Sequence, residues 1–497
     1  MNKIHVLLVP VLLAVSAVNS SAQHTLIPTY RWKASADVEL PAFVDNSLSR
    51  YFPPVIDQMG GSCAQASYIG YMFTYEVNRL LDRDASLPEN RFSYLYTWNF
   101  INGGEDEGSI GTDGLNLALQ NGVITEKDFP KQYSGSQFYW ASGYEKYFNG
   151  MHYRTDHFDE IEVVDAEGIE TVKRYLYDRN EPGKCGGIVT FSSRAGEWTF
   201  DNSYSGPSGT GYRSLLTSLS PTGAHAMTIV GYDDLVEFDA PDGKVSKGAF
   251  IVTNTYGTFF HDNGRFYLPY WFFLQERTGE QLSKTVTGVT VKYVDPLIVF
   301  RVGLEYSSRD DISFNFGVSG SSTDTYPQHN YVVPIAENQG GDYPMRGKYG
   351  DSDIEFGFDF SSHVEKMEGM DEPNYFLIVR RDIRGEMKGS GKMLSFSVYD
   401  YRKDKDKPVI HTCYEAKGVE LKEGKNIFNV SSVPPPQTSC SAVEWLQTIS
   451  KEPVSAPFVV RTAKGRFAKM KLDSYDREAG TIQLKYVYNP NSSRRLK

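Results

Sequence analysis

The stretch at residues 57–67, Asp-Gln-Met-Gly-Gly-Ser-Cys-Ala-Gln-Ala-Ser, carries a cysteine where a helix is expected to begin. Apolar residues recur at three- and four-residue steps from Ala66 to Leu80, which predicts one face of an α-helix. Ser62 is a residue type that caps helix N-termini, so Cys63 falls in the first turn. Unpaired backbone N–H groups and the helix dipole favour an anion there, and the thiolate is the nucleophilic form of cysteine. Gln58 lies just upstream, where its side-chain N–H groups can reach an oxyanion beside the sulfur.

Two later segments supply a histidine and an asparagine. His225 stands near the start of an apolar segment at residues 224–232, and Asn254 directly follows a second apolar segment at residues 249–253. Taken singly, a cysteine at a helix start or a histidine beside an apolar strand is more often structural than catalytic. The order Cys, His, Asn, with separations of 225 − 63 = 162 and 254 − 225 = 29 residues, indicates a nucleophile, its base and an amide that orients the base.

These motifs resemble those of the papain-like cysteine peptidase family, in which Gln…Ser-Cys, Gly-x-His-Ala and Asn-Ser-Trp-Gly carry the chemistry. The resemblance covers about residues 48–282 and implies that Cys63 is the nucleophile and His225 the general base, then the acid for the leaving amine. It implies that Asn254 orients the histidine, and that Gln58 and the Cys63 backbone N–H form the oxyanion hole. The expected reaction is hydrolysis of a peptide or protein substrate through a thioester, with no metal or cofactor. The cysteine and histidine are expected to pair as thiolate and imidazolium.

A glycine-rich loop at residues 102–111 lies where the family pairs its backbone with an extended substrate. Gly108 and Ser109 are the best match, because a substrate strand can approach glycine closely, and Ile110 is expected to line a subsite. Tyr256 stands where the family has tryptophan and is expected to shield the His–Asn pair. A plain surface loop is the alternative for residues 102–111. The acidic run Glu-Asp-Glu within it is either solvated or selective for basic side chains.

The N-terminus reads as a secretory signal peptide at residues 1–22, with a lysine, an apolar run and small residues before Gln23. No later run of eighteen apolar residues follows, so no integral membrane segment is expected after cleavage. We therefore expect an exported protein, secreted or periplasmic, from a Gram-negative bacterium. Residues 23–47 leave no room for the long inhibitory pro-segment usual in the family. The net charge of −11 argues against nucleic acid as a partner.

Three further cysteines show no zinc-ligand spacing. Cys413 and Cys440 flank a loop-like stretch and are candidates for a disulfide in an oxidising compartment, with free thiols as the alternative. Cys185 has no evident partner in the sequence.

The pattern along the chain predicts an α+β peptidase domain followed by β-rich units. Within residues 48–282, helical patterns precede strand patterns, which suits a helical lobe and a β-barrel-like lobe. From residue 283 to 425, apolar and polar residues alternate in several segments, which predicts an antiparallel β-sandwich-like domain. A proline-rich linker at residues 426–454 leads to a small β unit at residues 455–497. The β domains are candidates for contact with a surface or a glycan.

Two other functions stay open at this point. A papain-like scaffold that has lost activity would serve as a secreted binding or adhesion protein, although the intact Cys/His/Asn/Gln set argues against it. An aminopeptidase similar to bleomycin hydrolase has the same catalytic set, although those enzymes are typically intracellular. Cleavage of a peptide with a blocked N-terminus separates endopeptidase from aminopeptidase action.

Overall fold

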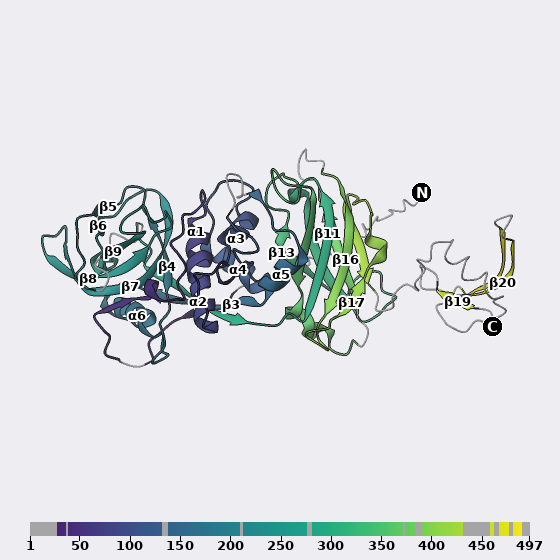
Figure 1. Ribbon diagram of the computed structural model, residues 1–497, viewed down its shortest axis with the longest axis horizontal. Coiled ribbons are helices and arrows are strands. Elements are labelled where there is room, and N and C mark those ends of the chain that lie inside the picture. Colours follow the sequence, from purple (N-terminus) through teal and green to yellow (C-terminus); the bar gives the residue numbers. More distant parts are fainter. Residues whose placement is uncertain are drawn as a thin grey trace, which may run out of the picture.

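The computed structural model describes residues 27–35, 38–131, 138–208, 212–275, 281–370, 373–382 and 389–430, and the backbone of three strands between 458 and 489. Helices occupy the middle of the molecule, with one β region on either side (Figure 1). The predicted α+β class is confirmed, as are the antiparallel sheets predicted for the second half. The predicted signal peptide and Cys440 lie outside the described residues. In the described part of the chain, no helix is both long and apolar enough to span a membrane.

A continuous helix begins at Cys63. It consists of α1 (Cys63–Gln65), a π-helical segment η2 (Ala66–Phe73) and α2 (Thr74–Leu81). The prediction of a regular α-helix is therefore wrong in its middle. All eight residues of η2 are buried, with β7, β4 and β10 packed around them, and π-helical turns occur frequently at functional sites. Apolar periodicity over so few residues does not distinguish the wider turn from an α-helical one.

Ser62 occupies the N-cap position of this helix, but its side chain makes no capping hydrogen bond, contrary to the prediction. The reason is its backbone, with φ −81° and ψ 12°, which is not the extended conformation from which a serine hydroxyl reaches the first helical N–H groups.

Helices α3 (Tyr94–Ile101) and α4 (Gly111–Asn121) pack against the central helix. Helix α4 ends at Asn121, and Gly122 follows it in the left-handed region at φ +73°. The bounds of the other helical elements are η1 (Asn46–Leu48), η3 (Pro88–Asn90), α3 (Tyr94–Ile101), α4 (Gly111–Asn121), α5 (Tyr144–Met151), α6 (Ala166–Tyr177) and α7 (Tyr270–Leu274).

A ten-stranded sheet runs beside the central helix in the order β1-β3-β10-β4-β7-β8-β9-β6-β5, with β2 paired to β7. Its strands are β1 (Thr29–Arg31), β2 (Phe43–Asp45), β3 (Tyr153–Glu162), β4 (Val189–Arg194), β5 (Thr199–Asp201), β6 (Leu215–Ser218), β7 (Ala224–Asp239), β8 (Val245–Thr253), β9 (Arg265–Pro269) and β10 (Thr285–Tyr293). In the antiparallel pair β7–β8, Thr228 lies opposite Thr253. The start of β7 and the end of β8 are therefore neighbours, although they are far apart in the chain.

The second β region is a pair of four-stranded antiparallel sheets, ordered β14-β11-β16-β17 and β13-β12-β15-β18. The rings of Phe300 and Phe316, one from each sheet, lie 4.4 Å apart between centroids and form part of the core between them. The strands are β11 (Ile298–Tyr306), β12 (Ile312–Ser319), β13 (His329–Glu337), β14 (Asp353–Asp359), β15 (Asn374–Arg381), β16 (Gly391–Asp400), β17 (Val409–Thr412) and β18 (Gly424–Val430), with 3₁₀ turns η6 (Arg309–Asp311), η7 (Ser361–Met367) and η8 (Tyr414–Ala416). A separate three-stranded sheet consists of β19 (Phe458–Arg461), β20 (Phe467–Asp476) and β21 (Thr481–Asn489).

The sandwich packs directly on the helices. Asn121 at the end of α4 donates to Gly357 O at 3.0 Å and accepts from the Asp359 backbone N–H at 2.8 Å, which fixes α4 to β14. Arg309 is buried, its guanidinium lies over the ring of Trp140, and it donates to the Gly340 carbonyl. The two regions thus share one continuous apolar core.

Candidate active site

Cys63 opens the central helix and packs against strand β7. Its thiol is half-buried, and burial raises the pKa of the thiol. The backbone N–H groups of Ala226, Ala64 and Cys63 itself act on the sulfur in the opposite direction, because they stabilise the thiolate. Ala226 directly follows His225, so the thiol lies beside the strand that carries the predicted base.

The central helix holds both strands of the site through residues spaced four apart. Ser67 donates from its hydroxyl to the Ala226 carbonyl at 3.0 Å, and Tyr71 donates to the Asn254 carbonyl at 2.9 Å. The hydroxyl of Tyr71 also accepts from the Ile56 backbone N–H at 2.7 Å. Cys63 and these two residues share a helix face, which fixes the thiol relative to the histidine and asparagine strands.

His225 and Asn254 are joined by a hydrogen bond of 2.9 Å between Nε2 and Oδ1. The Thr255 backbone N–H also donates to Asn254 Oδ1, at 2.7 Å. Because a backbone N–H can only donate, the atom beside it is the amide oxygen, and Nε2 of His225 carries the proton. Nδ1 is then the unprotonated nitrogen of the neutral ring. His225 is only 5% exposed, and burial lowers its pKa, while the hydrogen bond to Asn254 opposes that shift.

Tyr256 covers the histidine. Its ring lies nearly parallel to that of His225, and its hydroxyl is 3.3 Å from Nδ1. The Cys63 thiolate would repel a tyrosinate at this position, which helps to raise the pKa of Tyr256 after the larger effect of burial. Tyr256 is therefore close to both reacting groups.

Gln58 is held next to the Asn254 segment. Its backbone N–H donates to Thr255 O at 2.7 Å, and the Thr255 hydroxyl donates to Gln58 Oε1 at 2.5 Å. Gln58 Nε2 donates to Gly60 O at 2.6 Å. A glutamine amide has two N–H bonds, so the second stays available to a substrate oxygen. Thr255 is thus a positioning residue that the sequence motif contained but that its pattern did not single out.

The loop predicted to bind substrate is attached to the residue two positions after the cysteine. Gln65 is fully buried and donates from Nε2 to Ile110 O at 3.0 Å and to Ser109 Oγ at 3.3 Å. Gly108 is exposed and would have open space around an added Cβ, and Ile110 is 67% exposed. The loop backbone is therefore free to meet an extended chain. Sequence reasoning missed Gln65, because this helix contains several polar residues and no motif distinguishes Gln65 from the others.

One carboxylate of the acidic run in this loop makes a hydrogen bond to the protein backbone. Asp106 Oδ1 accepts from the Gly61 backbone N–H at 2.9 Å, in the turn just before Cys63. Gly61 itself packs so closely that an added Cβ would lie 2.7 Å from the Glu107 backbone. The Glu105 and Glu107 side chains are exposed. The loop and the turn before Cys63 are thus one packed unit.

Among the described residues, no group of three or more His, Cys, Asp or Glu side chains is placed to hold a metal ion. Cys185 is half-buried; it accepts from the Tyr75 hydroxyl at 3.5 Å and donates to Asn46 Oδ1 at 3.6 Å. Cys413 is buried, and its proposed partner Cys440 lies outside the described residues.

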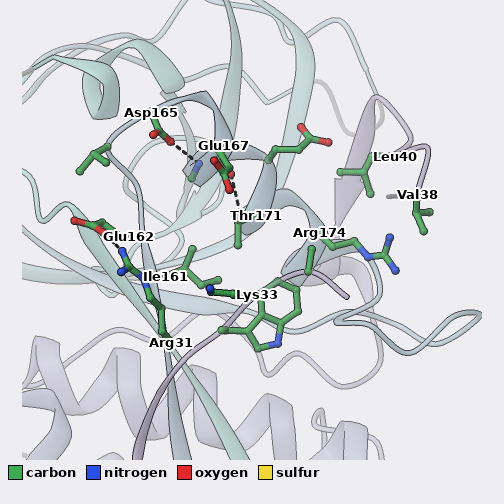
Figure 2. A pocket seen from close by; sticks show the side chains of 15 residues that line it. Arg31, Lys33, Val38, Leu40, Ile161, Glu162, Asp165, Glu167, Thr171 and Arg174 are labelled. Atoms are coloured by element: carbon green, nitrogen blue, oxygen red, sulfur yellow. Dashed lines mark hydrogen bonds and ion pairs between the residues drawn. The ribbon is translucent and has the colours of Figure 1, made fainter. Parts of the chain in front are cut away.

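A polar hollow of about 730 Å³ opens elsewhere on the protein, between the N-terminal segment and α6 (Figure 2). Arg31 and Glu162 form an ion pair at its wall, and Asp165 caps α6 beside them. None of the predicted site residues lines this hollow.

Comparison with known proteins gives structural likeness only. No protein-family model matches the chain, and no curated protein is similar to it. Over about half its length the chain matches solved structures of papain-like cysteine proteases. One is xylellain, a cysteine protease from Xylella fastidiosa, at 20% identity and a TM-score of 0.36, covering 55% of this chain and 97% of that one.

Two further matches are of the same kind. Procathepsin B S9 from Trypanosoma congolense is 13% identical with a TM-score of 0.37, covering 54% of this chain and 84% of that one. The proform of Amb a 11, a cysteine protease and ragweed pollen allergen, is 14% identical with a TM-score of 0.34. This match covers 51% of this chain and 66% of that one. At these identities and scores the likenesses carry no argument about activity, for which the geometry of the site is the support.

Proposed function

We propose that the protein is a cysteine endopeptidase that hydrolyses peptide bonds through Cys63, His225 and Asn254. The observation that carries the proposal is the 2.9 Å bond from His225 Nε2 to Asn254 Oδ1, beside a helix-opening cysteine. This bond leaves the other ring nitrogen of the histidine unprotonated. An orienting amide, a base and a nucleophile in one cluster form the arrangement that activates a thiol.

The reaction proceeds in two halves. Cys63 Sγ attacks the carbonyl carbon of the scissile bond while its proton passes to His225 Nδ1. The imidazolium then gives that proton to the leaving amine, the C–N bond breaks, and a thioester remains. Water, deprotonated by the neutral His225, attacks the thioester, and the carboxylic acid product and the thiol are released.

The oxyanion formed in each half has two candidate donors, the free N–H of Gln58 Nε2 and the backbone N–H of Cys63. Support comes from the anchoring of Gln58 on both sides, by Thr255 and by Gly60. Donors that are already oriented cost no reorganisation when negative charge develops. The substrate backbone would run along Gly108 and Ser109, with Ile110 and Tyr256 at its side chains.

Burial favours the neutral form of both reacting groups. It raises the pKa of Cys63 and lowers that of His225, so each group taken singly prefers its neutral form. A thiolate and an imidazolium stabilise one another when both are charged, so the groups titrate as a pair. The expected pH profile of kcat/KM is a bell with two apparent pKa values that belong to the pair.

The test is alkylation of the mature, reduced protein by a peptidyl epoxide that bears a blocked N-terminus, followed by intact-mass measurement. Cys63→Ala and His225→Ala are compared with Cys185→Ala, the matched control, whose thiol is also half-buried but lies away from the site. We expect one adduct on the wild type and on Cys185→Ala, none on Cys63→Ala and slow labelling of His225→Ala. Hydrolysis of an N-blocked peptide should follow the same order.

Three outcomes would contradict the proposal. An adduct that persists in Cys63→Ala would show that another residue reacts. Absence of both labelling and hydrolysis in the wild type would favour a scaffold that has lost activity. Cleavage restricted to peptides with a free N-terminus would change the assignment to an aminopeptidase.

We also propose that the enzyme acts after export, in the periplasm or outside the cell. The support is the pattern of residues 1–22, and mass spectrometry of the mature N-terminus tests it.

A further inference from the structure

A second imidazole lies behind the asparagine of the site. His261 Nε2 is 3.3 Å from Asn254 Nδ2, on the side of the amide opposite His225. His261 Nδ1 is 3.4 Å from the Ser214 hydroxyl oxygen, and that hydroxyl donates to Asn202 Oδ1 at 3.0 Å. Neither the mechanism above nor the sequence motifs make use of this second histidine.

The donors and acceptors along the chain of hydrogen bonds from Asn254 through His261 to Ser214 can be assigned. Asn254 Oδ1 faces the Thr255 backbone N–H, so the nitrogen that faces His261 is the amide NH2 group, which can only donate. His261 Nε2 must therefore accept, which leaves the proton on Nδ1. That proton points at Ser214 Oγ, whose own hydrogen is committed to Asn202.

We propose that His261 is a positioning residue of the peptidase site, which holds the Asn254 amide by accepting from its Nδ2 while Oδ1 orients His225. The inference rests on the proposed function, since it assigns His261 a part in that reaction. His261 touches neither the substrate nor the thiol in this role. It acts through Asn254, and it prevents the amide from rotating and presenting its NH2 group to the Nε2–H of His225.

The surroundings of His261 keep the ring in place and neutral. The ring packs against Phe200 and Phe266, with centroids 4.2 and 4.8 Å away. Burial, with a smaller effect of His225, lowers the pKa of His261 to about 4. A neutral ring retains the lone pair that the Asn254 amide requires, over the whole range in which a Cys–His pair operates.

The backbone conformation of His261 also helps to fix the position of its ring. Its φ is +54°, in the left-handed region that non-glycine residues adopt rarely. A residue held there presents its side chain to Asn254 at the turn that precedes β9.

The experiment compares His261→Leu with His261→Gln. Both side chains are unbranched at Cβ and bear the left-handed backbone alike, but only glutamine offers an acceptor oxygen near the position of Nε2. We expect His261→Leu to lose about tenfold in kcat with KM nearly unchanged, because the interaction supports His225 in the transition state. His261→Gln should recover several-fold of that loss. In an Asn254→Ala background, His261→Leu should cause little further loss, because its effect passes through Asn254.

Selective ¹⁵N labelling of histidine gives a readout independent of turnover: His261 is expected as the neutral tautomer with its proton on Nδ1. Three results would overturn the inference: full activity of His261→Leu, an equal loss in both variants, or full additivity with Asn254→Ala. In each case an active wild type would leave the proposed function intact. A proton on Nε2 would overturn the inference whatever the activity. A wild type that is neither active nor labelled refutes the proposed function, and the role of His261 in it.

Discussion

The phenol ring of Tyr256 lies on the imidazole of His225, with centroids 4.5 Å apart and planes 13° from parallel. Its hydroxyl is 3.3 Å from Nδ1, the nitrogen that takes the proton of Cys63 in the proposed mechanism. The aromatic cover thus carries a hydroxyl group, which a tryptophan at this position would lack. A hydroxyl hydrogen shared with Nδ1 stabilises the neutral imidazole and competes with the thiol proton.

Tyr256→Phe keeps the stacked ring and removes that hydroxyl. We expect the apparent pKa of the alkaline limb of alkylation to rise by up to about one unit, since a neutral hydrogen bond contributes about 1 kcal/mol and one unit is 1.36 kcal/mol. The rate of iodoacetamide labelling between pH 5 and 10 measures this. Tyr256→Ala is the control for loss of the ring itself. An alkaline limb that stays in place in Tyr256→Phe would show that the hydroxyl does not act on Nδ1.

Gln65 ties the proposed substrate loop to the helix that begins at Cys63, so its removal should affect substrate binding more than chemistry. Gln65→Met fills the buried site but breaks the bonds to Ile110 and Ser109. We expect KM to rise about three- to tenfold with kcat reduced less, the range for one or two hydrogen bonds. Thr97→Val, which removes only the hydroxyl that donates to Gln65 Oε1, should give a smaller rise. A fall in kcat at unchanged KM would contradict the assignment.

The contact between the sandwich and the helices offers a matched glycine pair. Gly340 has φ +91°, and an added Cβ would lie 2.4 Å from the Trp140 ring. Gly369 has φ +78° but nothing within 4 Å of its Cβ position. Both alanine variants bear the strain of a left-handed residue, about 1–2 kcal/mol, and only Gly340→Ala adds overpacking of about 1–3 kcal/mol. Urea unfolding should therefore show the larger loss for Gly340→Ala, and equal losses would argue that the contact is loose.

His363 makes the sandwich sensitive to acid. Its ring stacks on Tyr331 at 3.5 Å, and burial lowers its pKa to about 4, with Asp359 and Glu365 opposing and Lys366 adding to the shift. An unfolded histidine has a pKa of about 6.5, so below that pH the unfolded chain binds a proton that the folded chain does not. The contribution of neutral His363 to the free energy of unfolding is complete above pH 6.5 and is lost as the pH falls towards 4.

His363→Phe retains a ring against Tyr331 but cannot be protonated, so it should lose less stability than the wild type between pH 7 and 5. With the partial exposure of the ring taken into account, the difference is expected to be about 1 kcal/mol. Urea midpoints at the two pH values measure it. Equal losses in the two proteins would mean that other groups cause the acid sensitivity.

Much of the site is already present in local sequence. The helix that starts at Cys63, the strand that begins beside His225 and the strand that ends directly before Asn254 follow from apolar periodicity and flanking residues. Each forms at the predicted place, although both strands extend beyond the apolar segments seen in the sequence. Gly122 ends α4 because only glycine readily adopts its backbone conformation. Such features depend on interactions within a few residues, so a single segment of sequence determines them.

Only the tertiary structure determined the contacts between residues that are far apart in the sequence. The π-helical turns of η2, the bonds of Ser67 and Tyr71 to two remote strands, and the second imidazole behind Asn254 have no local signature. The first sheet likewise extends to β10, past the boundary expected at residue 282, because β10 pairs with β3 more than a hundred residues earlier. Sequence periodicity shows which face of an element is apolar. The partner of a buried polar atom depends on which distant elements meet that face, and only the packed chain determines that.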